Sequence, residues 1–428
     1  MLKFQSGFHW LGPFRMGVLV FLVTYSAGDT ISSQLPGENE THFTPVVMSV
    51  LTEPSPVLGS DGLTHFVYEL QLTNATSFPV QVESLEVLGG AKGERALAAF
   101  AGTDVSQIMQ EIMEKSPTDT LKSGLGAVAF IHFTVDKPEA GRTSLVHRLT
   151  ISGQFPPGFT HFMGLPASAN RIVEIGGPTK IHSPRPIIIG PPLEGKGWIA
   201  ADGCCTAKRH IRAIMPINGR LRVAQRFAID WVLINDEQRL FAGDPSDVKS
   251  YFAYGKKVLA VSDATVVSAI DKYENQVPGK LPSDMTLAEV YGNHVVLDLG
   301  NEQFAFYAHF QPGSLREHGV KVGDRVCRGQ VLGLVGNSGN TSSPHLHFHV
   351  MSSPSPLGSD GIPYVIEDFE LLGRAPSTEA IDKAEQDGTP LVVQEVDHSG
   401  KHSEELPLDL SVVAFPPRQP CGRSPEKQ

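Results

Sequence analysis

Cysteine is scarce in this chain, and so are the patterns in which cysteine usually binds a metal. The 428 residues contain four cysteines, of which Cys204 and Cys205 are adjacent while Cys327 and Cys421 stand alone. No two of them have the CxxC spacing, which excludes a metal site built on such a pair. Four cysteines fit an oxidising compartment, but their positions in the sequence assign no disulfide.

Clustered positive charge is also missing. Asp and Glu number 46 against 35 Lys and Arg, which gives a formal net charge of -11 at pH 7. A surface that binds nucleic acid through its phosphates needs clustered Lys and Arg. The sequence shows no such cluster, so we expect no nucleic-acid partner.

Long apolar runs are absent except near the N-terminus, where one short run occurs. Residues 16–24 (MGVLVFLVT) are fewer than the ~20 that a membrane-spanning helix needs. Lys3 and Arg15 precede this run and the small residues 26–28 (SAG) follow it. This pattern predicts a signal peptide over residues 1–28 and export from the cytoplasm. Contact with a membrane is expected only in the alternative, in which the segment stays uncleaved as an anchor.

The length and composition predict more than one β-rich domain. A chain of 428 residues exceeds the usual size of one hydrophobic core, and its 42 Gly and 32 Pro supply many turns. Phe66, Tyr68, Leu70 and Leu72 alternate with mostly polar residues, as in a half-buried strand. Similar runs recur, so we predict an immunoglobulin-like β-sandwich over residues 43–155. Its histidines are single and scattered, and we expect neither metal nor catalysis there.

Two changes of composition divide the rest of the chain. Residues 178–192 are rich in Pro, Ile and Gly and predict an extended linker, because Pro cannot donate to a central sheet ladder. Residues 370–428 become polar and charged and predict a peripheral or disordered tail. Within this tail, residues 406–415 could add a final strand. A second domain is expected between these segments, at residues 200–369.

Three histidines alternate along one predicted strand of this second domain. They are His345, His347 and His349. Residues i and i+2 of a strand project from the same face, about 6.6–6.8 Å apart. Two imidazoles on one face can serve one small site, one binding a metal and the other contacting its water. The alternative is a solvent-exposed face that happens to be rich in histidine.

Asp230 lies in an otherwise apolar run, between Ile229 and Trp231. A carboxylate buried there is costly unless it is paired or bound to a metal. A hydrolytic zinc site uses three protein ligands, usually His with Asp or Glu, and leaves the fourth position to water. Asp230 is therefore a candidate ligand, and a salt bridge or a turn cap is the alternative.

Four segments resemble the peptidase family M23, to which lysostaphin and LytM belong. They are residues 226–231 (RFAIDW), 306–310 (FYAHF), 320–336 (VKVGDRVCRGQVLGLVG) and 344–350 (PHLHFHV). The resemblance covers residues 224–350, and the last two segments are the most specific. It implies a mostly β protein in which an M23-type antiparallel β-sheet peptidase domain follows the sandwich.

The resemblance also implies an activity and a site. The activity is zinc-dependent cleavage of peptide bonds in peptidoglycan, and the location would be the periplasm, the cell envelope or the exterior. Asp230 and His347 would be ligands of Zn²⁺, and His309 and His345 would be the catalytic imidazoles. Peptidoglycan or its peptides would be the main partner.

One departure from the family concerns the first zinc ligand. In the family a histidine stands four residues before the aspartate, but this position is Arg226, which has no lone pair to offer a metal. Another imidazole could fill the vacancy, and the candidates are His210 and His349. We favour His210, because it precedes the Asp230 strand and could fold back beside it. His349 could reach the metal only if its strand curls, and it stands where the family usually has a glutamate.

Two functions therefore remain open from the sequence. The first is a zinc endopeptidase acting on peptidoglycan peptides, supported by Asp230, His309, His345 and His347. The second is a non-catalytic domain that binds the cell wall or activates other wall hydrolases, supported by Arg226. The zinc content of the purified protein separates the two.

Overall fold

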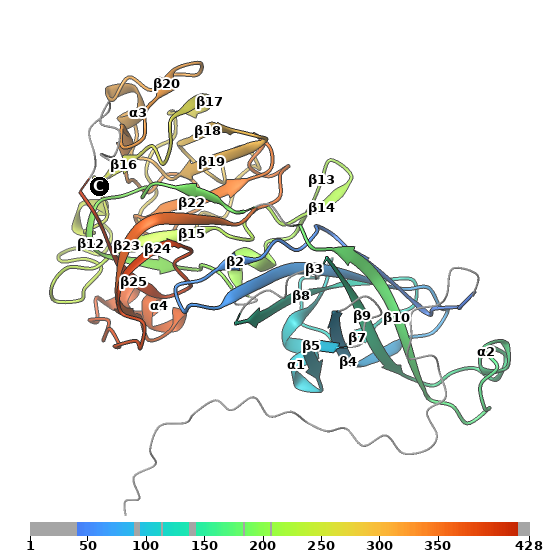
Figure 1. Cartoon of the computed structure of the whole chain (residues 1–428). Coiled ribbons are helices and arrows are strands. Elements are labelled where there is room, and N and C mark those ends of the chain that lie inside the picture. The colour runs from blue at the N-terminus through green and yellow to red at the C-terminus, as the bar shows by residue number, and fades with distance from the viewer. Residues whose placement is uncertain are drawn as a thin grey trace, which may run out of the picture.

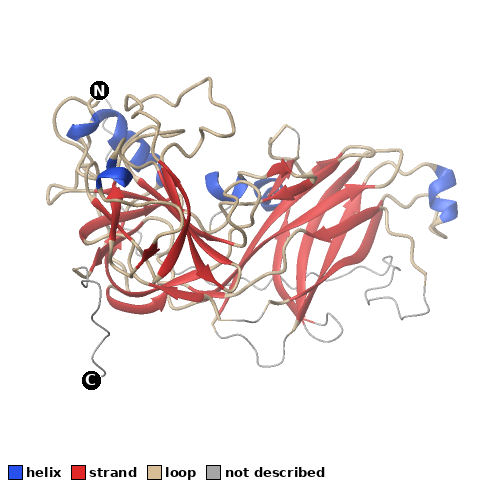
Figure 2. Cartoon of the chain, turned by 90° about the horizontal axis from the view of Figure 1, so that it is seen from above, coloured by secondary structure: helices blue, strands red, loops and turns tan. Residues whose placement is uncertain are grey.

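The protein is mostly β, as predicted. The computed structural model describes residues 41–89, 95–112, 114–136, 143–182, 185–205 and 208–417. The predicted signal peptide, residues 1–28, lies outside these ranges. Within them, no helix has both the length and the apolar character that crossing a membrane requires. The few helices are short and lie at the periphery, whereas strands fill both halves of the molecule (Figure 2).

The N-terminal half is a sandwich of two antiparallel sheets (Figure 1). The first sheet has the order β1-β3-β8-β6, and β2 also pairs with β3. Its strands are β1 (Val46–Val50), β2 (Val57–Leu58), β3 (Thr64–Asn74), β6 (Met109–Glu111) and β8 (Gly126–Val135). The second sheet has the order β10-β9-β4-β5, and β7 also pairs with β4. Its strands are β4 (Val80–Gly89), β5 (Arg95–Ala101), β7 (Thr120–Leu121), β9 (Ser144–Ser152) and β10 (Arg171–Lys180). Helices α1 (Thr103–Ile108) and α2 (Pro157–Phe162) interrupt these strands.

The sandwich extends beyond residues 43–155. Strand β10 pairs with β9 along most of its length, so this half of the molecule reaches Lys180. Ile172 of β10 is buried in the core between the two sheets. The immunoglobulin-like character of the sandwich stays a prediction.

Strand β3 is buried on both faces, which differs from the half-buried strand expected. Phe66, Tyr68, Leu70 and Leu72 enter the core of the sandwich, as their alternation predicts. The opposite face is covered by the C-terminal half, and Val67 is part of that half's hydrophobic core. The sequence pattern misses this because Glu69, on the covered face, is fully buried although it is charged.

The C-terminal half is built on one large sheet with the order β11-β23-β25-β12-β15-β22-β19-β18-β17-β20, and β24 also pairs with β23. Its strands are β11 (Ile187–Ile189), β12 (Gly195–Ala201), β15 (Ile229–Leu233), β17 (Ala264–Ile270), β18 (His294–Gly300), β19 (Gln303–Ala308), β20 (Arg325–Val326), β22 (Leu346–Met351), β23 (Tyr364–Arg374), β24 (Gly400–Glu405) and β25 (Ser411–Phe415). Two small sheets pair β13 (Met215–Ile217) with β14 (Arg220–Arg222), and β16 (Lys257–Leu259) with β21 (Val331–Leu334). The helices of this half are two 3-10 helices, η1 (Arg209–Arg212) and η2 (Val248–Ser250), and two α-helices, α3 (Ser314–Glu317) and α4 (Thr378–Asp387).

The expected linker and tail both contribute to this sheet. Strand β11, inside residues 178–192, pairs in parallel with β23. In the polar segment after residue 370, α4 buries Ile381 and Ala384 against the sheet. Its N-cap Ser377 accepts a hydrogen bond from the backbone N–H of Ala380 at 3.1 Å, which satisfies one of the free donors of the first turn. A few apolar residues and a cap thus order a segment whose average composition is polar.

Candidate functional site

The candidate site lies where β15 and β22 pair. Asp230 and His347 are directly opposite each other in this antiparallel register, so their side chains share one face. His347 Nδ1 lies 2.7 Å from Asp230 Oδ1. The neighbours Ile229 and Phe348 point to the other face and enter the main hydrophobic core. Because side chains alternate between the two faces of each strand, Asp230 and His347 lie on one face of the sheet and their apolar neighbours pack on the other.

His210 joins this pair from the turn η1. Its Nε2 lies 3.3 Å from Asp230 Oδ2, and its ring centroid lies 5.0 Å from that of His347. One ligand atom each of His210, Asp230 and His347 lie within 4.8 Å of one another. The three residues come from η1, β15 and β22, so the fold gathers a possible metal-binding group from segments far apart in the sequence.

A hydrogen bond to the backbone orients the ring of His210. Its Nδ1 lies 2.9 Å from the carbonyl oxygen of Asp202. A carbonyl can only accept, so Nδ1 carries the proton of this hydrogen bond. In the neutral ring the lone pair is then on Nε2, the atom that faces Asp230. This is the arrangement that orients histidine ligands in metal sites.

His309 and His345 lie beside the group and are held in the same way. His309 Nδ1 donates to the carbonyl oxygen of Ser338 at 2.7 Å, and His345 Nδ1 donates to that of Ser343 at 2.8 Å. Their ring centroids are 4.8 Å apart. His345 Nε2 lies 3.5 Å from Asp230 Oδ1. Both neutral rings therefore keep an Nε2 lone pair that can accept a proton at the site.

His349 does not lie beside Asp230. Its Nδ1 is 3.1 Å from Nε2 of His347, on the side of that ring away from the carboxylate. The side chain is fully buried, and among the described residues its Nε2 has no hydrogen-bond partner. Of the two candidate imidazoles, His210 therefore lies beside Asp230, and His349 lies on the far side of the His347 ring.

Arg226 points away from the group and into the boundary between the two halves. Its Nε and Nη2 donate to the two carboxylate oxygens of Glu69 at 2.8 and 2.5 Å, and its Nη1 donates to the carbonyl oxygen of Gly361 at 2.6 Å. Both side chains of the pair are buried, with 3% and 0% exposed. Arg226, where the family resemblance leads us to expect a histidine, therefore connects the sandwich to the C-terminal half.

The carboxylate and the imidazoles of the group shift one another's pKa values. Burial would raise the pKa of Asp230, but the surrounding imidazoles, His210 first among them, hold it well below its usual range. Burial lowers the pKa of His210, yet the carboxylates of Asp230 and Asp202 outweigh this and raise it to about 9. Burial lowers the pKa of His309 well below its ordinary value. A carboxylate held anionic among imidazoles is an environment suited to a bound cation.

Helix α4 holds two parts of the site in place, although the composition of its segment predicts a peripheral or disordered tail. Glu385 accepts a hydrogen bond from Ser343 Oγ at 2.8 Å, next to the carbonyl that orients His345. Arg209, the neighbour of His210 in η1, pairs with Asp382 at 2.5 Å. These helix residues lie within the predicted tail, where only the i, i+3 spacing of Asp382 and Glu385 could have indicated a shared face.

A family comparison covers part of the C-terminal half. Residues 248–358 match the profile of peptidase family M23. The matched stretch contains His309, His345 and His347, whereas His210 and Asp230 precede it.

Two curated relatives and one solved structure illustrate what the chain is similar to. A peptidoglycan DD-endopeptidase, ShyA of Vibrio cholerae, is 38% identical over 68 residues, which are 16% of this chain and 15% of the relative. The glycyl-glycine endopeptidase ALE-1 of Staphylococcus capitis is 32% identical over 111 residues, which are 26% of this chain and 25% of the relative. The chain thus covers a quarter or less of the length of these relatives. A zinc-containing peptidase from Vibrio cholerae aligns at 14% identity over 68% of this chain and 80% of its own, with a TM-score of 0.20.

Proposed function

Since residues 248–358 are a peptidase family M23 domain, we propose that this protein is a zinc-dependent endopeptidase that cleaves peptides of peptidoglycan. The observation that carries the proposal is the grouping of His210, Asp230 and His347 within 4.8 Å, beside two further imidazoles. Two relatives named as endopeptidases, one of them for peptidoglycan, support the substrate class.

The residues present fit zinc. Two imidazole nitrogens and one carboxylate oxygen are the donor set of a hydrolytic zinc site, in which three protein ligands leave one position to water. His210 would supply Nε2, His347 would supply Nδ1, and Asp230 would supply its carboxylate. When bound, zinc would lower the pKa of a water molecule and polarise the carbonyl group that is attacked.

The remaining imidazoles would transfer protons during cleavage and orient the ligand His347. His309 and His345 each carry the proton on Nδ1, so Nε2 can accept a proton from the attacking water and return it to the leaving amine. His349 would accept the Nε2 proton of His347, which leaves the Nδ1 lone pair of His347 directed at Asp230 and the metal. Replacing the family's usual glutamate by His349 preserves an acceptor at this position.

Zinc content and cleavage tested together decide between the two candidate functions. The wild-type protein should hold one zinc per chain and release peptides from purified peptidoglycan, and His347→Ala should lose both. His182→Ala is the matched control, because this histidine is exposed and is not part of the group. If the wild type holds no zinc and cleaves nothing, the proposal fails. The alternative then applies, a domain that binds the wall or activates other wall hydrolases.

The proposed substrate requires an envelope location, which the predicted export segment would provide. Fractionation of cells of the native host should recover the protein outside the cytoplasm. Recovery of all of it in the cytoplasmic fraction would contradict this part of the proposal.

A further inference from the structure

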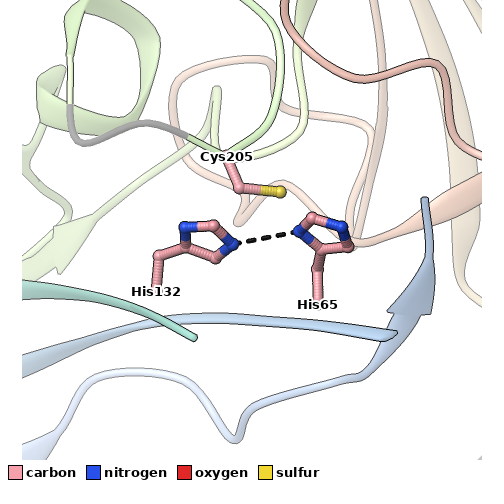
Figure 3. Close-up of side chains that lie close together, drawn as sticks. All are labelled: His65, His132 and Cys205. Carbon is pink, nitrogen blue, oxygen red and sulfur yellow. Dashed lines mark hydrogen bonds between the residues drawn. The ribbon is translucent and has the colours of Figure 1, made fainter. Parts of the chain in front are cut away.

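A second group of metal-binding side chains lies at the boundary between the two halves. It consists of His65, His132 and Cys205, one ligand atom of each lying within 4.8 Å of the others (Figure 3). The two histidines come from the sandwich, and the cysteine comes from the loop after β12. None of these residues belongs to the group around Asp230.

The strand register brings the two histidines together. His65 is opposite Thr134 and Val67 is opposite His132, so the histidines are diagonal neighbours on one face of the β3–β8 pair. Their rings are stacked, with centroids 5.2 Å apart and planes 5° from parallel. His65 Nδ1 lies 3.0 Å from His132 Nε2, and the two nitrogens share one proton in this contact.

The side chain of Asp61 fixes which nitrogen of His65 is available. Its Oδ1 lies 3.0 Å from His65 Nε2 and can only accept, so Nε2 carries a proton. The lone pair of His65 is then on Nδ1, the atom that faces His132 and Cys205. A carboxylate behind a histidine is the support typical of metal ligands. Gly59 leaves room for this ring, because a Cβ there would come within 2.7 Å of His65 Nε2.

Cys205 closes the group from the other half and is joined to Cys204 by a disulfide. His65 and Cys205 are 3% and 6% exposed, and His132 is less deeply buried, which leaves an approach for an ion. Two imidazoles and a thiolate are soft to borderline donors, which favour late first-row transition metals over Mg²⁺ or Ca²⁺.

We propose that His65, His132 and Cys205 form a second metal site, which binds a divalent ion such as Zn²⁺ or Co²⁺ once the Cys204–Cys205 disulfide is reduced. A phosphine reductant takes up an oxygen from water and becomes its oxide, and the disulfide gains two electrons and two protons to give two thiols. The Cys205 thiol releases its proton when sulfur binds the ion. The proton between the two rings moves to Nδ1 of His132, which leaves both facing nitrogens free to bind.

This site would join the two halves in a redox-dependent way. The ligands come from β3, β8 and the loop after β12, so a bound ion adds a connection that the oxidised protein lacks. Binding to the folded state alone stabilises it by mass action. The proposal is independent of the peptidase function, because it uses none of the residues assigned to that function.

Cobalt is the probe that separates the two sites. Thiolate bound to Co²⁺ gives a charge-transfer absorption in the near ultraviolet, which a site of imidazoles and carboxylate cannot give. The full-length protein, reduced with a phosphine and titrated with Co²⁺, should develop this absorption, and the oxidised protein should not. Cys205→Ser should abolish it, and His132→Gln should weaken Co²⁺ binding by more than about 10-fold. His347→Ala and the control His182→Ala should leave it unchanged.

The Cys204→Ser variant tests the proposal without a reductant, in case reduction of the disulfide disturbs the fold. This variant has no disulfide partner at position 204, so Cys205 is a thiol and should give the Co²⁺ absorption without a reductant. Its cooperative thermal transition should shift upward when Co²⁺ is added. Absence of the absorption in folded Cys204→Ser, or its persistence in Cys205→Ser or in His65→Gln combined with His132→Gln, would overturn the proposal.

Discussion

Arg226 and Glu69 form a bidentate ion pair between the two halves of the molecule, with donor–acceptor distances of 2.8 and 2.5 Å. The polar contacts of the Arg226 side chain are with Glu69 and Gly361, and none of them is with His210, Asp230 or His347. The position that would supply a zinc ligand in the family resembled thus serves the boundary between the halves here.

Loss of this arginine should cost stability and leave the zinc content intact. Arg226→Met leaves a buried carboxylate without its counter-charge, and breaking a buried pair in this way costs about 3–5 kcal/mol. Denaturant unfolding should show this loss, and the double variant Glu69→Gln with Arg226→Met should recover much of it. A loss of zinc from Arg226→Met as complete as that from His347→Ala would show that the arginine supports the metal group after all.

Substitution of His210 should weaken zinc binding more than substitution of His349, because we propose that His210 is a zinc ligand and that His349 only contacts the ligand His347. His210→Ala removes one of the three proposed zinc donors and should abolish both zinc binding and cleavage while the protein stays folded. His349→Ala removes the acceptor behind His347, for which a loss of ~10–100-fold in zinc affinity is typical. Zinc titration of both variants measures the difference, and equal affinities in the two would contradict these assignments.

Substitution of His309 or His345 should lower the rate of peptide cleavage and leave the zinc content unchanged. His309→Gln and His345→Gln each remove an imidazole that we propose exchanges protons, and such a group contributes typically ~10²–10⁴-fold in rate. Each variant should keep its zinc, because neither residue is among the three proposed ligands. The measurement is kcat on peptidoglycan fragments beside metal analysis of the same samples. Variants that lose zinc and activity together would place these histidines among the ligands.

The sandwich should become less stable as the pH rises, because of Glu174. Burial raises the pKa of Glu174 from 4.5 to about 8, while its Oε2 accepts only one long hydrogen bond, from the N–H of Val46 at 3.4 Å. The folded protein then binds more protons than the unfolded chain between these two pKa values, so stability falls across that pH window and is level above it. The loss is on the order of a few kcal/mol.

Glu174→Gln provides the check for this pH dependence. The amide keeps the acceptor for Val46 and cannot ionise, so the variant should melt at a higher temperature than the wild type at pH 8 and at nearly the same temperature at pH 4.5. Parallel melting curves of the two proteins at all pH values would refute the role of Glu174.

The sequence predicts what depends on local pattern. The alternation of Phe66 to Leu72 predicts the inner face of β3. The i, i+2 spacing of His345 and His347 predicts one shared site, and both rings lie near Asp230 although His345 immediately precedes β22. The apolar run around Asp230 indicates that its carboxylate is buried and in need of a partner. In each case the signal lies within a few residues of the chain.

Features that depend on contacts between distant segments were not predictable in this way. Glu69 and Arg226 are 157 residues apart, and nothing near either residue indicates the other. The same holds for His65, His132 and Cys205, whose histidines look single and scattered in the sequence. His210 could be inferred only from a missing ligand, and the backbone carbonyls that orient it and His309 carry no sequence signature.

The two buried faces of β3 have a consequence for dividing the molecule. A fragment of residues 43–155 would lack β10 and expose Val67 and Phe130, which are covered by the C-terminal half. It would also bring Glu69 into water, where a carboxylate needs no arginine. We therefore expect such a fragment to be prone to aggregation and loosely packed. The boundary between the two halves is part of the folding unit, and grafting the sandwich onto another protein would require the matching surface as well.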